Sequence, residues 1–204
     1  MTKLLQISPK AKGLIFDMDG TIANSIPLHL DNWDEICKDL HCSVDRGVLV
    51  KMTGRPTVDF ARHIIETNNL HDVDAHELAR QKQKTFWKNV HRVQEIKEVT
   101  KLIYEYHNVL PMSVGTGACR KSALLQLETL NLTKYFRVIV SADDVVRHKP
   151  HPDTFLKCAE AMDVDPKYCQ VFEDGELGLE AARMAGMIAT DVRPYLLNND
   201  DFCH

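Results

Sequence analysis

The chain has 204 residues, of which 44% are hydrophobic and 26% charged, a composition typical of soluble globular proteins. Its formal net charge of −4 excludes a strongly basic nucleic-acid-binding protein, so an anionic ligand would have to be bound by local cations. Residues 1–12 contain no apolar stretch long enough for a signal peptide or a membrane span, and the six cysteines lack the spacing of a zinc site. We therefore expect a cytoplasmic protein with free thiols and no nucleic-acid or membrane partner.

In chain order, five short apolar runs that end in polar residues predict strands buried on both faces. These runs cover residues 13–16, 111–115, 136–140, 170–172 and 187–189. Between them, apolar spacing and flanking proline or glycine residues predict helices over 122–130, 154–162 and 177–185. The alternation predicts an α/β fold, with a Rossmann-like parallel sheet, helices on both faces, and polar groups beyond the carboxyl ends of the strands.

Residues 23–92 interrupt this alternation, because their pattern predicts helices without strands. These helices are expected at roughly 28–40, 57–68 and 75–90. We expect an all-helical cap over residues 23–92, inserted into a core formed by residues 1–22 and 93–204. Two linkers, at residues 24–27 and near 91–94, would make a hinge at the cap possible. The aromatic residues of this segment are expected to form the interior of the cap, namely Trp33, Phe60, Phe86 and Trp87.

The sequence DMDGT, residues 17–21, directly follows the first predicted strand. Asp17 and Asp19 are two residues apart at a strand end, so they can face one small site and divide the roles of nucleophile and general acid/base. Their carboxylates would repel a phosphate dianion, so such a site needs a cation. A plain Asp-Gly turn is the alternative that this motif alone leaves open.

A second acidic pair, Glu173 and Asp174, follows the predicted strand 170–172. Mg²⁺ prefers hard oxygen ligands in octahedral geometry. The side chains of Asp17 and Asp174, with the backbone carbonyl of Asp19, would supply part of such a shell. Glu173 would bind the ion or the waters around it. The alternative is an acidic loop that only stabilises the start of the next helix through its dipole.

Two further motifs can neutralise or bind a phosphoryl group. Lys149 lies in a loop, where its ammonium can neutralise Asp17 and phosphoryl oxygens. Thr116 and Gly117 follow the second strand of the predicted sheet, where a hydroxyl group and accessible backbone N–H groups can donate to a phosphate oxygen. Taken alone, each motif is equally consistent with a surface lysine or an ordinary strand-to-helix turn.

Together the motifs occur in the order D-x-D-G-T, T, K and E-D. This order, with the runs 148–155 and 173–187, resembles phosphatases of the haloacid dehalogenase superfamily that carry a helical cap after the first motif. The resemblance covers residues 13–192. Within the superfamily, the chain is most similar to bacterial sugar phosphatases of the fructose 1-phosphate type and to β-phosphoglucomutases.

The resemblance implies that Asp17 attacks phosphorus and forms an aspartyl-phosphate. Asp19 would protonate the leaving alcohol and then activate water, while Thr116 and Lys149 hold the transferred oxygens. Asp19 must be protonated for the first step, and the negative charge of Asp17 would favour that form. Haloacid dehalogenases themselves lack both this second aspartate and the metal, so Asp19 argues against dehalogenation.

Three cap residues are candidates for binding the substrate beyond its phosphate. The run 53–57 resembles the substrate-specificity loop of the family and contains Arg55. Lys82 and His29 fall where related mutases and phosphatases place a substrate-facing lysine and a hinge histidine. Solvated surface charges are the alternative reading of Arg55 and Lys82.

The sequence therefore predicts a Mg²⁺-dependent phosphoric monoester hydrolase. Its substrate would be a small sugar phosphate, such as fructose 1-phosphate or a 6-phosphogluconate-like compound. One alternative is a β-phosphoglucomutase-like isomerase that uses the same aspartyl-phosphate. Another is a non-catalytic sugar-phosphate-binding module, against which the presence of Asp17 and Asp19 argues. We expect a monomer or a small homo-oligomer.

Overall fold

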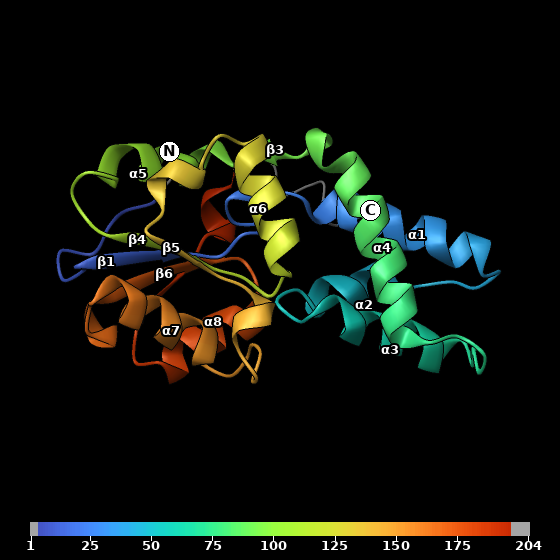
Figure 1. Ribbon diagram of the computed structural model, residues 1–204. Coiled ribbons are helices and arrows are strands. Elements are labelled where there is room, and N and C mark those ends of the chain that lie inside the picture. The colour runs from blue at the N-terminus through green and yellow to red at the C-terminus, as the bar shows by residue number, and fades with distance from the viewer. Residues whose placement is uncertain (1–3, 197–204) are drawn as a thin grey trace.

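Five parallel strands lie at the centre of the computed structural model, which describes residues 4–196 (Figure 1). Neighbouring strands in this sheet follow the order β5-β4-β1-β6-β7. The strands are β1 (Gly13–Phe16), β4 (Met112–Gly115), β5 (Val138–Val140), β6 (Cys169–Glu173) and β7 (Ile188–Asp191). Each overlaps one of the predicted apolar runs, and every neighbouring pair is parallel, so the predicted sheet is confirmed.

Alternate side chains of β1 point to opposite faces of the sheet, and each face packs against helices. Leu14 and Phe16 belong to the apolar layer with α5 and α6, whereas Ile15 belongs to the layer with α7 and α8. Figure 1 shows the two pairs of helices on opposite sides of the sheet. The bounds are α5 (Lys97–Tyr106), α6 (Arg120–Thr129), α7 (Asp153–Met162) and α8 (Glu176–Met184). The prediction of helices on both faces is confirmed.

A helical segment is inserted between β1 and β4 and lies beside the sheet in Figure 1. It contains α1 (Ile26–Asp39), α2 (Arg46–Lys51), α3 (Thr57–Thr67) and α4 (Ala75–Asn89). Strands β2 (Ala23–Asn24) and β3 (Gln94–Glu95) pair antiparallel at its two ends. The predicted helical insert is confirmed. The antiparallel pair of β2 and β3 lies at the two predicted linkers. The division at residues 22/23 and 92/93 stays a prediction.

The interior of the helical insert is a separate apolar cluster from the two layers of the sheet. Trp33 and Ile36 of α1 pack there with Ile64 of α3, and Phe60 packs against them. Phe86 and Trp87 instead pack with the layer that covers α5 and α6, and the Trp87 indole donates to the Ser122 hydroxyl at 2.9 Å. Placing these two aromatic residues in the cap interior was therefore wrong. They join the insert to the sheet domain.

Five of the cysteines are free thiols in the described part of the chain, as predicted, and Cys203 lies outside it. The free thiols are Cys37, Cys42, Cys119, Cys158 and Cys169. Among residues 4–196, no helix combines the length and the apolar character that crossing a membrane requires.

Candidate active site

The predicted catalytic motifs meet at one edge of the sheet because the strands are parallel and in register. Phe16 pairs with Val114 on one side and with Phe172 on the other. Asp17 follows β1, Thr116 follows β4, and Glu173 ends β6, so their side chains reach the same edge. All three residues are almost fully buried.

Lys149 joins this group from the loop after β5. Its Nζ donates to Asp17 Oδ1 at 2.6 Å and to Glu173 Oε2 at 2.7 Å, and its side chain has no exposed surface. Burial would lower the pKa of this ammonium group, but the charges of Asp17 and Glu173 raise it above its usual value. Lys149 is therefore held as a buried cation against the predicted nucleophile.

Asp17, Glu173 and Asp174 form a carboxylate cluster, with one ligand atom from each within 4.8 Å of the others. Burial and the charge of Glu173 raise the pKa of Asp17 above its usual value and raise that of Asp174 to about 8. Because Lys149 supplies one positive charge to three carboxylates, further positive charge is needed to keep all three ionised. The donor set, all carboxylate oxygen, fits Mg²⁺.

The carboxylates of this cluster are oriented by the surrounding chain. Both oxygens of Glu173 accept hydrogen bonds, one from Lys149 and one from the Gly175 N–H at 2.9 Å. The Thr21 hydroxyl donates to Asp174 Oδ1 at 2.8 Å. Gly20 has a φ of 89° and lies so close to Asp174 that a Cβ would overlap its carboxylate. The glycine of the DMDGT motif thus permits both the turn and the approach of Asp174.

The Asp19 carboxylate does not join the acidic cluster but turns toward the helical insert. Its Oδ1 accepts from Ser25 Oγ at 2.6 Å and from Gln126 Nε2 at 2.9 Å, and lies 3.0 Å from His29 Nε2. Burial would raise the pKa of Asp19, but His29, Ser25 and Gln126 lower it below its usual value. The expectation that the charge of Asp17 favours protonated Asp19 is therefore wrong for this arrangement.

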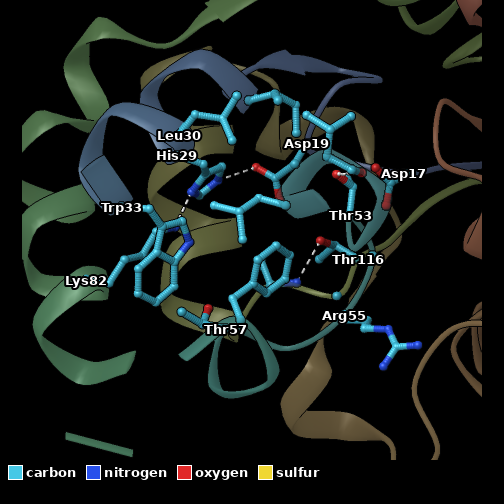
Figure 2. A pocket seen from close by; sticks show the side chains of 17 residues that line it. Asp17, Asp19, His29, Leu30, Trp33, Thr53, Arg55, Thr57, Lys82 and Thr116 are labelled. Atoms are coloured by element: carbon cyan, nitrogen blue, oxygen red, sulfur yellow. Dashed lines mark hydrogen bonds and ion pairs between the residues drawn. The ribbon is translucent and has the colours of Figure 1, made fainter. Parts of the chain in front are cut away.

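His29 connects Asp19 to Lys82. Lys82 of α4 is 4% exposed, its Nζ contacts His29 Nδ1, and it lies 5.3 Å from the centre of the Phe86 ring. Burial lowers the pKa of Lys82 to about 8, and burial together with Lys82 lowers that of His29. The alternative of Lys82 as a solvated surface charge is wrong, because its ammonium group points into the site (Figure 2).

A cavity opens between the sheet edge and the insert, with about 620 Å³ of empty space that is partly open to solvent. Asp17, Asp19 and Thr116 line one end of it. All four predicted substrate-binding residues also line it, namely His29, Arg55, Lys82 and Gly117. Figure 2 shows Arg55 at the margin, with its guanidinium directed away from His29 and Trp33. Trp33 and Phe60 stack with ring centres 6.4 Å apart and also line the cavity, a position that the sequence analysis missed.

Two loops approach each other closely across this cavity. Gly117 lies against the backbone of Gly54, so that a Cβ at position 117 would overlap the Gly54 carbonyl. Gly54 has a φ of 97°, and a Cβ there would come within 3.3 Å of the Lys149 Cδ. Gly117 therefore permits contact between the predicted phosphate-binding loop and the predicted specificity loop.

Three polar residues that contact the predicted catalytic and metal-binding groups were not among the candidates from the sequence. Thr21 lies in the first motif, and the bond of its hydroxyl to Asp174 spans 153 positions. Ser25 and Gln126 both contact Asp19. Ser25 stands near the motif and could have been considered a candidate. Nothing local marks Gln126, which is 107 positions from Asp19.

Comparisons with known proteins agree with this architecture. The haloacid dehalogenase-like hydrolase family matches residues 14–192. The chain is 42% identical over 181 residues to fructose-1-phosphate phosphatase YqaB of Escherichia coli (strain K12), covering 89% of this chain and 96% of that protein. It is 26% identical over 189 residues to β-phosphoglucomutase of Bacillus subtilis (strain 168), covering 89% and 83% of the two chains.

A solved structure of β-phosphoglucomutase from Clostridium difficile has a TM-score of 0.80 against this chain at 21% identity. The alignment covers 89% of this chain and 84% of that one, and it supports the fold. The motif order and the family match over residues 14–192 lead to the same assignment: the chain belongs to the haloacid dehalogenase-like hydrolase family.

Proposed function

We propose that this protein is a Mg²⁺-dependent phosphatase that hydrolyses a small sugar phosphate through an aspartyl-phosphate on Asp17. The observation that carries the proposal is the group formed by Asp17, Lys149, Glu173 and Asp174. Asp17 of this group lines the cavity, and so does Asp19. A nucleophile, a fixed cation and a separate acid/base group are the components that two-step transfer of a phosphoryl group requires.

In the first step, a carboxylate oxygen of Asp17 attacks phosphorus while the bond from phosphorus to the sugar oxygen breaks. Asp19 gives its proton to that leaving oxygen. The hydrogen bonds on Asp19 favour its ionised form, but a phosphate dianion beside it adds negative charge and raises its proton affinity. Lys149 and the Thr116 hydroxyl stabilise charge on the phosphoryl oxygens.

In the second step, Asp19 accepts a proton from water as the water oxygen attacks phosphorus. The bond from phosphorus to Asp17 breaks, and inorganic phosphate leaves with the original aspartate restored. The three hydrogen-bonding partners of Asp19 suit this step, because they keep its carboxylate oriented and in the ionised form, which is the form that can accept a proton.

Asp17, Asp174 and the backbone carbonyl of Asp19 would hold Mg²⁺, with Glu173 orienting the site through Lys149 and the Gly175 N–H. When bound, the ion supplies positive charge to the phosphoryl oxygens and to the crowded carboxylates. The chemistry of the carboxylate cluster supports this assignment, because burial and the charge of Glu173 raise the pKa values of Asp17 and Asp174, and a bound cation would favour their ionised forms.

Sugar phosphates are proposed as the substrate class from the relative and from the cavity. YqaB, 42% identical to this chain, is a fructose-1-phosphate phosphatase. The cavity combines donors from Lys82 and Arg55 with the stacked rings of Trp33 and Phe60. Donors can bind hydroxyl groups while aromatic rings contact the apolar face of a sugar, so the lining suits this class.

The test is to incubate the purified protein and Mg²⁺ with fructose 1-phosphate, 6-phosphogluconate and β-glucose 1-phosphate, measuring phosphate release and isomer formation. We expect stoichiometric phosphate from at least one substrate without a bisphosphate activator. Asp17→Asn is the control for contaminating phosphatases, and it should lower turnover by roughly a thousandfold or more. Conversion of β-glucose 1-phosphate mainly to glucose 6-phosphate would show a mutase instead, and no turnover of any ester would support the binding module.

A further inference from the structure

Gln126 occupies an unusual position for an uncharged polar residue. It lies on α6 with no exposed surface, between Ala123 and Leu127, which are also fully buried. Its Nε2 donates to Asp19 Oδ1, whereas its Oε1 is buried and has no hydrogen-bond partner within residues 4–196. A leucine would suit this apolar layer better, since a buried amide oxygen without a partner destabilises the fold. Apolar packing therefore does not explain the amide, whose hydrogen bond goes to Asp19.

Gln126 is also the only one of the three partners of Asp19 that belongs to the sheet domain. Ser25 and His29 lie in the segment that begins the helical insert, at the start of α1. Helix α6 belongs to the sheet domain, where it packs with the apolar layer of β1 and β4, and Trp87 of the insert bonds to its Ser122. The bond from Gln126 therefore comes from the sheet domain, whereas the other two come from the start of α1.

All three bonds reach the same oxygen of Asp19, so they fix Oδ1 and leave Oδ2 for the reacting groups. The amide NH₂ can donate to Oδ1 in both forms of the carboxyl group, because Oδ1 remains an acceptor whether Oδ2 is ionised or carries the proton. An acid/base that gives and regains a proton through Oδ2 can therefore keep this partner throughout the turnover.

We infer that Gln126 is a positioning residue for the proton-transfer group Asp19, which its amide holds from the sheet domain so that the second carboxyl oxygen faces the leaving group and water. This inference rests on the proposed function. It concerns how Asp19 is oriented, and it predicts that both proton-transfer steps depend on an amide at position 126.

The test uses Gln126→Leu with two classes of substrate. p-Nitrophenolate is a good leaving group that needs no proton, so the first step on p-nitrophenyl phosphate should keep its wild-type rate. Hydrolysis of the aspartyl-phosphate needs Asp19 as a base, so the variant should show a rapid burst of p-nitrophenolate followed by slow turnover. Turnover of the sugar phosphate should fall by roughly tenfold to a hundredfold, with KM little changed.

Gln170→Leu is the matched control, because Gln170 is also a buried amide but bonds to Gln6, Ser8 and Thr190, away from the site. Gln170→Leu should lower the melting temperature and create no burst, whereas Gln126→Leu should create the burst. The inference would be overturned if Gln126→Leu hydrolysed the sugar phosphate at the wild-type rate. Equal losses of burst rate and steady-state rate, together with a lower melting temperature, would also overturn it. Absence of turnover by the wild-type protein on every ester would instead refute the proposed function.

Discussion

At the scale of single residues, Lys82 is a buried amine whose effect on the free energy of unfolding depends on pH. Burial lowers its pKa in the folded protein to about 8 from the ordinary value of 10.5, so between these values the unfolded chain binds more protons. The free energy of unfolding should therefore rise with pH across this window, by on the order of 3 kcal/mol from this group.

Lys82→Met isolates this effect, because methionine fills a similar volume without a charge. The variant should be more stable than wild type at neutral pH, and the difference should shrink as the pH approaches about 10.5. Denaturant unfolding of both proteins across this range is the measurement. A difference that stays constant with pH would mean that Lys82 retains an ordinary proton affinity in the folded protein.

Arg55 and Lys82 line the same cavity but differ in exposure, and both can contact the substrate only beyond its phosphate. We expect Arg55→Ala and Lys82→Ala to lower kcat/KM on the preferred sugar phosphate by roughly tenfold or more, because each removes a hydrogen-bond donor. p-Nitrophenyl phosphate should be much less affected, because it offers these donors no hydroxyl group. Equal losses on both substrates would assign the residues to general closure of the site.

At the scale of structural elements, the loop of residues 53–55 lies against the predicted phosphate-binding loop through Gly54 and Gly117. Gly117→Ala would force these loops apart, since its Cβ would overlap the Gly54 carbonyl. We expect kcat/KM for sugar phosphates to fall by roughly tenfold or more, with a melting temperature close to that of wild type.

Gly175→Ala is the matched control for this prediction. A Cβ at position 175 would lie 3.5 Å from the Thr53 carbonyl oxygen, an ordinary contact with the same loop, and 3.3 Å from Glu173 Oε1, which a small shift of that side chain would relieve. Its effect on kcat/KM should be much smaller than that of Gly117→Ala. Similar kinetics for the two variants would show that contact between these loops does not limit catalysis.

Some of these structural elements could be predicted from the sequence and others could not. The strands were predictable because buried parallel strands are short apolar runs whose polar residues follow at the sheet edge, as Asp17 and Thr116 do. Helix α5 was missed, although Val99, Leu102 and Ile103 are buried at helical spacing and could have revealed it. Helix α2 has six residues, too few for a periodic signal.

The positions of buried side chains depended on contacts that no local pattern encodes. Phe86 and Trp87 lie on a helix of the insert, yet they pack toward the sheet domain, because α4 faces both parts of the molecule. Gln126 has the sequence context of an ordinary helical glutamine. Its role depends on a partner brought near by tertiary packing, which only the three-dimensional arrangement reveals.

At the scale of the whole molecule, stability should depend on Mg²⁺, because the carboxylates of Asp17, Glu173 and Asp174 repel one another at one end of the sheet. An ion that binds the folded state alone stabilises it, by about 2.7 kcal/mol at a hundred times its Kd. We expect the melting temperature to rise with Mg²⁺ and activity to disappear in excess chelator. Ca²⁺ should also stabilise the protein but support turnover poorly, because its coordination is looser.

Asp174→Asn supplies the control for the metal prediction, because it removes a carboxylate from the cluster and keeps the shape of the side chain. The variant should lose most of the dependence of melting temperature on Mg²⁺. The proposed metal site would be contradicted if the wild-type protein kept its full activity in excess chelator. A wild-type melting temperature that does not change with Mg²⁺ would contradict it as well.

The pairing of β2 with β3 has a consequence for how this protein can evolve. The two ends of the helical insert leave the sheet domain side by side, with the Ile96 N–H bonded to the Ile22 carbonyl at 2.8 Å. A segment whose ends are adjacent can be lengthened, shortened or exchanged without redirecting the chain that surrounds it. The insert can therefore change in evolution without disturbing the sheet domain. Residues of the insert that line the cavity can then vary while Asp17, Glu173 and Asp174 stay in place.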